Sequence, residues 1–186
     1  MNKRKRNLAI FFAALLLAAG LAGFFLRHPA GILVPPVSSE LDSVPEFVLK
    51  DDAGAYVRSS DLMGTSTVIT LWASWCSLCR EEIKYLEAAK KEFKDAVAVI
   101  AVNRAESSET ARAALGTLGG KNSIMFLLDS DDSLWHALHG FSMPETIFMD
   151  RGGSILFHAR GLIRPEEIHR RVEDLLAHEQ MTYQAQ

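Results

Sequence analysis

Cys76 and Cys79 are the residues whose type and spacing best fit a chemical role, and they are the only cysteines among the 186 residues. A disulfide between them closes a very short loop, so it restricts the unfolded chain little and contributes little to stability. A C-x-x-C pair inside a β-α-β pattern is instead typical of reversible thiol-disulfide exchange. We therefore expect a redox-active disulfide as the chemical centre, with no further cofactor.

The two sulfurs are expected to differ in role because the pair lies where a buried strand gives way to a helix. At a helix N-terminus, the dipole and the free N–H groups favour the thiolate, which is the attacking species. Cys76 holds this position, whereas Cys79 lies one turn further in and should be more buried. The pattern predicts Cys76 as the nucleophile and Cys79 as the residue that resolves the mixed disulfide.

The elements that must position this pair follow from the apolar pattern. Continuous apolar and β-branched runs predict buried strands, and apolar residues at helical spacing predict helices. In chain order the expected elements are strands at 47–49, 56–57 and 67–72, a helix at 79–93, a strand at 97–102, a helix capped by Ser107 or Ser108 and ending at Gly119-Gly120, a strand at 124–128, a short helix at 133–138, strands at 146–149 and 155–158, and a helix from Pro165. The first two strands form a β-hairpin. This order predicts an α/β domain with one mixed sheet covered by helices on both faces.

The N-terminus carries the pattern of a membrane segment. Four basic residues in the tip at 1–7 precede 19 uncharged, mainly apolar residues at 8–26. A helix needs about 20 apolar residues to cross a bilayer core, whereas the apolar part of a cleavable signal peptide has about 7–15. We expect an uncleaved transmembrane helix at 8–26, with a cleaved signal peptide as the alternative. The positive-inside rule keeps the basic tip in the cytoplasm, so the rest of the chain is exported.

The exported part is expected to be a single domain on a tether. Residues 27–43 contain several prolines and serines and form a linker, residues 44–178 form the domain, and the polar residues 179–186 form a flexible tail. The expected location is the cell inner membrane, crossed once, with the domain in the periplasm. The net charge of −3, without a basic stripe outside the tip, argues against a nucleic-acid partner.

Two segments of the domain resemble known proteins. Residues 72–82, WASWCSLCREE, and residues 143–150, MPETIFMD, are similar to the active-site and cis-proline segments of thioredoxin-fold proteins. They are most similar to the membrane-anchored TlpA/ResA/CcmG (DsbE) group of thiol-disulfide oxidoreductases. The resemblance covers roughly residues 44–177, and it implies a thioredoxin-like fold to which the opening β-hairpin is an N-terminal extension.

The resemblance also implies a substrate groove. It implies a cis peptide bond before Pro144, beside the cysteine pair, where an ordinary trans loop proline is the alternative. Because proline has no N–H, Met143 would then offer its backbone groups to an extended substrate peptide. Trp75 is expected to shape the same site.

Two carboxylates match acidic residues that the resemblance places near the cysteines. These are Glu82 and Glu145. A carboxylate near the sulfurs raises the pKa of their thiols, and it can accept the proton that Cys79 loses. The alternative for Glu82 is an exposed position on the helix, like that of Glu81.

The sequence departs from the resembling group at two positions that bear on the reduction potential. Leu78 stands where many relatives carry proline before the second cysteine. Thr70 stands where ordinary thioredoxins bury an aspartate, which leaves more of the proton transfer to Glu82.

Other groups of candidate ligands are incomplete. His136 and His139 have no third ligand evident nearby, and Asp129, Asp131 and Asp132 lack the glycine and the closing glutamate of a calcium loop. We expect no metal site, a surface histidine pair and a loop with a helix cap. Exported copper chaperones with a thioredoxin-like fold have a C-x-x-x-C motif, and the cysteines of this chain do not have that spacing.

These observations predict an enzyme, a membrane-tethered reductase of protein disulfides on the exported side. Its expected partners are disulfide-containing exported proteins, including apocytochrome c by resemblance, and a membrane thiol transporter of the DsbD/CcdA type that recharges it. The alternatives are an oxidase or isomerase of the same fold and a peptide-binding module without redox turnover.

Overall fold

The computed structural model describes residues 41–118 and 123–184. The expected tip at 1–7, the transmembrane helix at 8–26 and the linker up to residue 40 lie outside these residues. Within the described part, no helix combines the length and the apolar character that crossing a membrane requires.

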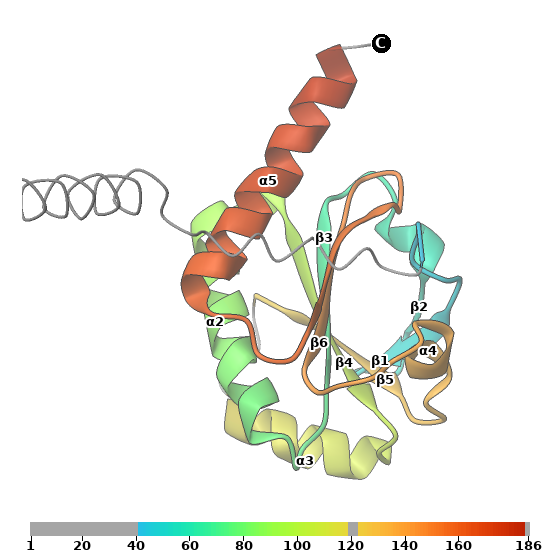
Figure 1. The fold of residues 1–186 in the computed structure, drawn as a ribbon. Helices are drawn as coiled ribbons and strands as arrows, with labels where there is room; N and C mark the ends of the chain where they lie inside the picture. The colour runs from blue at the N-terminus through green and yellow to red at the C-terminus, as the bar shows by residue number, and fades with distance from the viewer. Residues whose placement is uncertain (1–40, 119–122, 185–186) are drawn as a thin grey trace, which may run out of the picture. The chain divides into compact units, whose positions relative to one another are not determined.

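One seven-stranded mixed sheet forms the centre of the domain, with the strand order β2-β1-β5-β4-β3-β6-β7 (Figure 1). The strands are β1 (Val48–Asp51), β2 (Tyr56–Arg58), β3 (Thr67–Trp72), β4 (Ala98–Arg104), β5 (Met125–Asp129), β6 (Glu145–Met149) and β7 (Ile155–Arg160). β3, β4 and β5 are mutually parallel, whereas the remaining strands run antiparallel to their neighbours. Every residue of β3 is buried, as its continuous apolar and β-branched run predicts.

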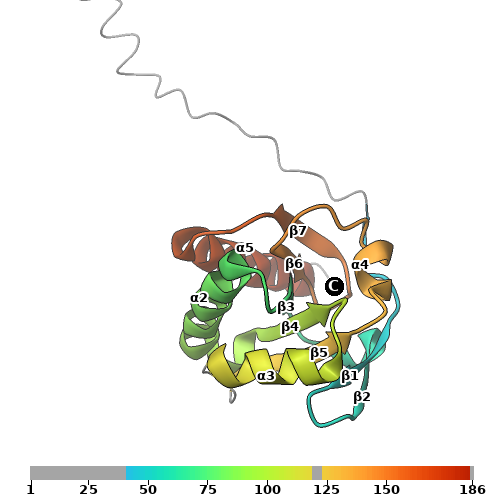
Figure 2. The same cartoon turned by 90° about the horizontal axis from the view of Figure 1, so that it is seen from below.

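Helices cover both faces of this sheet (Figure 2). They are α2 (Ser77–Phe93), α3 (Ser108–Leu118), α4 (Ser133–Ala137) and α5 (Pro165–Gln184), with short 3-10 turns η1 (Ser59–Leu62) and η2 (Lys94–Ala96). α2, α3 and α5 pack on one face over a core that includes Trp72 and Phe148. α4 and the segment before β1 cover the other face, over a core that includes Leu71 and Leu134. The predicted mixed sheet with helices on both faces is therefore confirmed.

The C-terminal helix differs from the prediction. α5 continues to Gln184, so the tail expected to be flexible from residue 179 is helical up to that point. Glu179 ties this part of the helix to the domain, because its carboxylate accepts a hydrogen bond from Ser66 and lies 3.1 Å from Nε of Arg151. The polarity of the tail did not reveal these contacts, which join positions far apart in the sequence.

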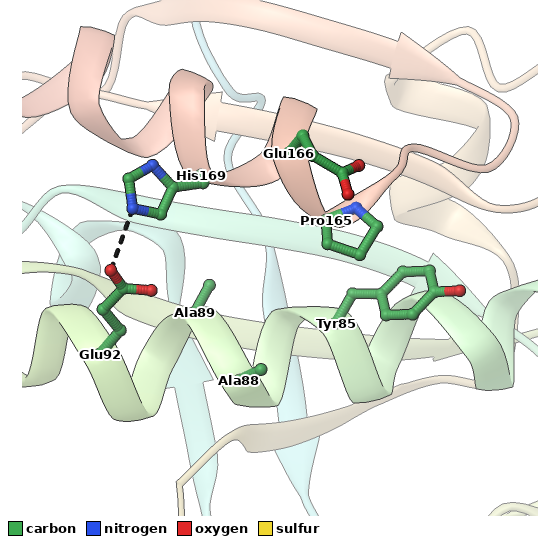
Figure 3. A pocket seen from close by; sticks show the side chains of 7 residues that line it. All are labelled: Tyr85, Ala88, Ala89, Glu92, Pro165, Glu166 and His169. Atoms are coloured by element: carbon green, nitrogen blue, oxygen red, sulfur yellow. Dashed lines mark hydrogen bonds and ion pairs between the residues drawn. The ribbon is translucent and has the colours of Figure 1, made fainter.

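α2 and α5 lie side by side and leave a surface pocket of about 410 Å³ between them (Figure 3). The lining residues are Tyr85, Ala88, Ala89, Glu92, Pro165, Glu166 and His169. No cysteine lines this pocket, so it is distinct from the redox pair.

His169 links the two helices electrostatically, and this link predicts a pH-dependent contribution to stability. Its Nε2 lies 3.0 Å from Glu92 on α2, and its Nδ1 lies 3.4 Å from Glu173 on α5. The hydrogen bond to Glu92 is the largest cause that raises the pKa of His169. A histidine with a raised pKa stabilises the folded state below its unfolded pKa, and this contribution is lost as the pH rises through the folded pKa.

We therefore expect His169→Gln to lower the thermal unfolding temperature at about pH 5.5 and to change it little at about pH 8.5. Circular dichroism melts of both proteins at the two pH values measure the difference. An equal loss at both pH values would assign the effect of His169 to packing.

Candidate redox site

The loop from β3 to α2 places both cysteines at the N-terminus of α2. They form a disulfide with an S–S distance of 2.02 Å and Cα atoms 5.3 Å apart. Cys76 is the N-cap residue, and its Sγ accepts a hydrogen bond from the N–H of Cys79 with an N···S distance of 3.1 Å. α2 therefore begins at Ser77 rather than at Cys79 as predicted, because sulfur here takes the place of the usual capping oxygen.

Cys79 is more buried than Cys76, as the sequence predicts. Cys76 is 6% exposed and Cys79 is 1% exposed, while the neighbouring Trp75 and Leu78 are 67% and 46% exposed. The Sγ of Cys76 is here a disulfide sulfur. On reduction, the N–H of Cys79 faces a thiolate instead, and a hydrogen bond to the charged sulfur favours that thiolate. The geometry favours Cys76 as the nucleophile.

A cis peptide bond joins Met143 and Pro144, as the resemblance implies. β6 follows directly, and its first residue pairs with Leu71 near the end of β3. The cis bond therefore lies at the same edge of the sheet as the loop that leads to Cys76. Met143 is half-buried, and Phe141 just before it is 81% exposed. Exposed apolar side chains thus lie next to the cysteines in sequence, at Trp75 and Leu78, and close to the cis bond in sequence, at Phe141.

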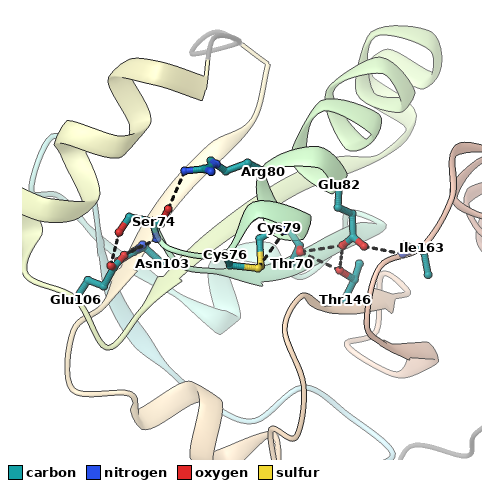
Figure 4. The surroundings of a disulfide bond; sticks show 10 residues. All are labelled: Thr70, Ser74, Cys76, Cys79, Arg80, Glu82, Asn103, Glu106, Thr146 and Ile163. Atoms are coloured by element: carbon teal, nitrogen blue, oxygen red, sulfur yellow. Dashed lines mark hydrogen bonds between the residues drawn. A yellow bond between two sulfur atoms is a disulfide. The ribbon is translucent and has the colours of Figure 1, made fainter.

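Glu82 is a fully buried carboxylate one turn after Cys79 on α2. It accepts hydrogen bonds from the hydroxyls of Thr70 (3.2 Å) and Thr146 and from the N–H of Ile163 (2.8 Å) (Figure 4). Burial raises the pKa of Glu82, and the three hydrogen bonds offset only part of this effect. The alternative of an exposed helix position is therefore wrong.

Thr70 contributes to this buried network directly. Its Oγ1 lies 2.8 Å from Oγ1 of Thr146 and donates to the Glu82 carboxylate. At the position where ordinary thioredoxins are expected to bury an aspartate, this chain thus has a hydrogen-bond donor to Glu82. The proton-accepting capacity of this part of the core is concentrated on one carboxylate.

Glu145 lies on the opposite face of the sheet from Glu82, because successive strand residues point to opposite faces and Thr146 takes the Glu82 side. Its Oε1 lies 2.6 Å from Nε2 of the buried His158, and its Oε2 accepts a hydrogen bond from the N–H of Phe141 at 2.9 Å. Burial raises the pKa of Glu145, but the contacts with His158 and Phe141 outweigh it and hold the pKa below its ordinary value. Glu145 therefore supports the segment before Pro144, and an effect on the sulfurs stays a prediction.

Glu106, which lies between β4 and α3, is a further residue of this site and was not among the predicted site residues. Its carboxylate accepts hydrogen bonds from the N–H and the hydroxyl of Ser74 and from the side chain of Asn103 (Figure 4). One signal could have found it. Trp72 and Asn103 pair where the parallel strands β3 and β4 end, so polar residues after both strands meet at one edge of the sheet.

Comparison with known proteins agrees with this geometry. Residues 40–174, most of the chain, match the family model described as Redoxin. The chain belongs to the redoxin family.

This redoxin has relatives with thiol-disulfide names. It is 27% identical over 168 residues to the thiol-disulfide oxidoreductase ResA of Bacillus subtilis, covering 90% of this chain and 92% of ResA. It is 31% identical over 162 residues to the thiol:disulfide interchange protein DsbE of Vibrio cholerae, covering 84% and 86% of the two chains.

Solved structures show the same fold. The crystal structure of a thiol:disulfide interchange protein DsbE from Chlorobium tepidum aligns with a TM-score of 0.68 at 24% identity, over 73% of this chain and 96% of that one. The fold of this redoxin is thus thioredoxin-like. The cysteine pair, the family and the relatives together identify a thiol-disulfide oxidoreductase of the ResA/DsbE type.

The remaining candidate ligands of this redoxin have structural contacts. Asp129 accepts hydrogen bonds from the N–H groups of Leu134 and Trp135, which confirms the predicted helix-capping loop. Asp132 pairs with Arg104. Within residues 41–118 and 123–184, no group of three or more His, Cys, Asp or Glu side chains is arranged to hold a metal ion.

Proposed function

We propose that this redoxin is a membrane-tethered, extracytoplasmic reductase of protein disulfides, with the Cys76–Cys79 pair as its only redox group. In this role the Cys76 thiolate attacks a disulfide of the substrate and forms a mixed disulfide with one of its sulfurs. Cys79 then attacks Cys76, which releases the substrate as two thiols and leaves the Cys76–Cys79 disulfide. Two electrons pass from the enzyme to the substrate.

The buried carboxyl of Glu82, three residues after Cys79, is the observation that carries the reductive direction. A strong oxidant of this fold stabilises its reduced form by favouring the thiolate. A carboxylate beside the sulfurs has the opposite effect, because a like charge raises the pKa of the thiols. Glu82 can also take the proton of Cys79 when that residue attacks the mixed disulfide.

The surface around the disulfide supports a polypeptide as the substrate. Trp75 and Leu78 next to the cysteines in sequence, and Phe141 near the cis bond in sequence, are exposed apolar side chains, and exposed apolar surface beside a reactive group suits an interaction site. In this proposal Met143, at the cis bond before Pro144, offers its backbone groups to an extended peptide strand of the substrate. We propose disulfide-containing exported proteins as substrates, among them apocytochrome c.

The apolar segment at 8–26 supports a tether with the domain outside the cytoplasm. In an oxidising compartment, a reductase stops after one turnover unless electrons are delivered to it. A membrane thiol transporter of the DsbD/CcdA type is therefore the proposed donor.

The reduction potential of the pair tests the direction. Equilibration of the purified domain with glutathione and with a stronger thiol couple should give a potential near or below about −270 mV, the value of thioredoxin. A value near about −120 mV, typical of strong oxidants, would establish the oxidase alternative. The observation that favours this alternative is the hydrogen bond from the N–H of Cys79 to Sγ of Cys76, because it stabilises a Cys76 thiolate. Absence of thiol turnover in both directions would leave only the peptide-binding module.

A further inference from the structure

All the polar groups of Ser74, two residues before Cys76, are held by side chains of other segments. Its N–H donates to Oε2 of Glu106 at 2.8 Å, and its hydroxyl donates to Oε1 of Glu106 at 2.6 Å. Its carbonyl oxygen accepts a hydrogen bond from Nη1 of Arg80 at 3.0 Å (Figure 4). The loop between β3 and α2 is thus fixed from both sides.

Glu106 is in turn held by a rigid part of the sheet. The buried Asn103 donates from Nδ2 to Oε2 of Glu106 at 2.7 Å, and Asn103 pairs with Trp72 in the β3–β4 register. Burial raises the pKa of Glu106, but the hydrogen bonds from Asn103 and Ser74 outweigh it and hold the pKa below its ordinary value. The side chain is therefore a carboxylate at neutral pH.

The hydrogen-bond pattern suits a carboxylate better than an amide. Two N–H groups and one hydroxyl converge on its two oxygens, and a carboxylate accepts hydrogen bonds without donating any. A glutamine has one accepting oxygen and one donating NH2 group, so the hydroxyl of Ser74 must rotate to accept from it, and all the hydrogen bonds at this position lose their charge assistance.

We propose that Glu106 is a positioning residue for the redox reaction, which fixes residues 73–75 and so holds Sγ of Cys76 where Cys79 can attack it. Two further hydrogen bonds carry the restraint along the chain. The N–H of Cys76 donates to the carbonyl of Ala73 at 3.0 Å, and the N–H of Cys79 donates to Sγ of Cys76 at 3.1 Å. The inference rests on the redox role of the pair, and it holds for either direction of electron flow.

Reaction of the reduced protein with oxidised glutathione tests this proposal. The Cys76 thiolate attacks the glutathione disulfide and releases one glutathione as a thiol. Cys79 then attacks Cys76, releases the second glutathione and closes the protein disulfide, so two electrons pass to glutathione. We expect Glu106→Gln to slow the second step about tenfold, because intramolecular attack depends steeply on alignment. The protein carrying one glutathione then accumulates, and intact mass after acid quenching detects it.

Glu109→Gln is the matched control, since Glu109 is an exposed residue in the first turn of the nearby α3 and the change removes the same charge. It should react like the wild type. Equal second-step rates in the wild type and in Glu106→Gln would overturn the proposal. A shift in the pH midpoint of the first step with an unchanged second step would also overturn it, because charge rather than position would then be the cause.

Ser74→Ala is a second variant that tests the same contact if Glu106→Gln does not fold. It removes only the hydroxyl donor and should slow the second step less than Glu106→Gln does. In the double variant the two effects should not multiply, because both act through one contact; independent effects would contradict the proposal. A wild-type protein that does not react with oxidised glutathione would contradict the proposed function instead.

Discussion

Replacing Cys79 with serine should leave Cys76 joined to its substrate through a stable mixed disulfide and reduce turnover to the uncatalysed level. Cys79 lies one helical turn from Cys76, and its N–H is 3.1 Å from Sγ of Cys76. Attack from such a position has an effective concentration of about 10⁵ M or more, which no free thiol in solution can match. Serine keeps the size of the side chain and the helix, and it removes only the attacking sulfur.

The trapped adducts can be collected from cells that express the Cys79→Ser variant and identified after reduction. The same experiment names the physiological substrates, which the sequence leaves open. Cys76→Ser is the matched control, and it should form no adduct because Cys79 is only 1% exposed. Adducts on the Cys76→Ser variant but not on Cys79→Ser would reverse the roles of the two cysteines.

Glu82→Gln should slow the release of substrate about 10²-fold, the low end of what a positioned proton acceptor contributes. Glutamine fits the same buried volume and can still accept the N–H of Ile163, while the hydroxyls of Thr70 and Thr146 can rotate. The variant should therefore fold, but it cannot take the proton of Cys79. The pH profile of turnover should shift to higher pH, where Cys79 loses its proton to solvent.

The same substitution should stabilise the protein at neutral pH. Burial raises the pKa of Glu82, and a carboxyl with a raised pKa contributes stability that is complete below its unfolded pKa and is lost as the pH rises through the folded pKa. Each unit of pKa difference corresponds to about 1.4 kcal/mol. Urea unfolding should thus find Glu82→Gln more stable than the wild type at about pH 8 and similar to it at about pH 4.

Glu81→Gln, one residue earlier on the helix and partly exposed, is the control for both effects. It removes the same charge from α2. The pH profile of its turnover and the pH dependence of its stability should stay like those of the wild type. A Glu82→Gln variant with the turnover profile of the wild type would mean that another group accepts the proton of Cys79.

The strands could be predicted closely because their residue types settle their conformation. The predicted strand at 67–72 coincides with β3, whose β-branched and apolar residues fit a fully buried strand. The start of α2 was predicted less well, since it depends on a hydrogen bond to Sγ of Cys76. The end of α5 was predicted wrongly, because Glu179 finds its partners in distant turns.

The site divides in the same way. Cys76, Cys79 and the cis bond before Pro144 follow from short motifs, so the sequence alone predicted them. Glu106 and His158 belong to no motif. Glu106 matters because the ends of β3 and β4 meet, and His158 matters because it lies beside Glu145 in the structure. A single sequence does not show which strands pair or in which register.

The first two residues of β6 connect the cis bond to both faces of the sheet. Thr146 reaches Glu82 on one face, and Glu145 holds the backbone of Phe141 on the other. Because side chains alternate along a strand, a slip of β6 by one residue against β3 and β7 would exchange the two faces and break both contacts at once. The register of β6 should therefore be as strictly constrained as the spacing of the two cysteines.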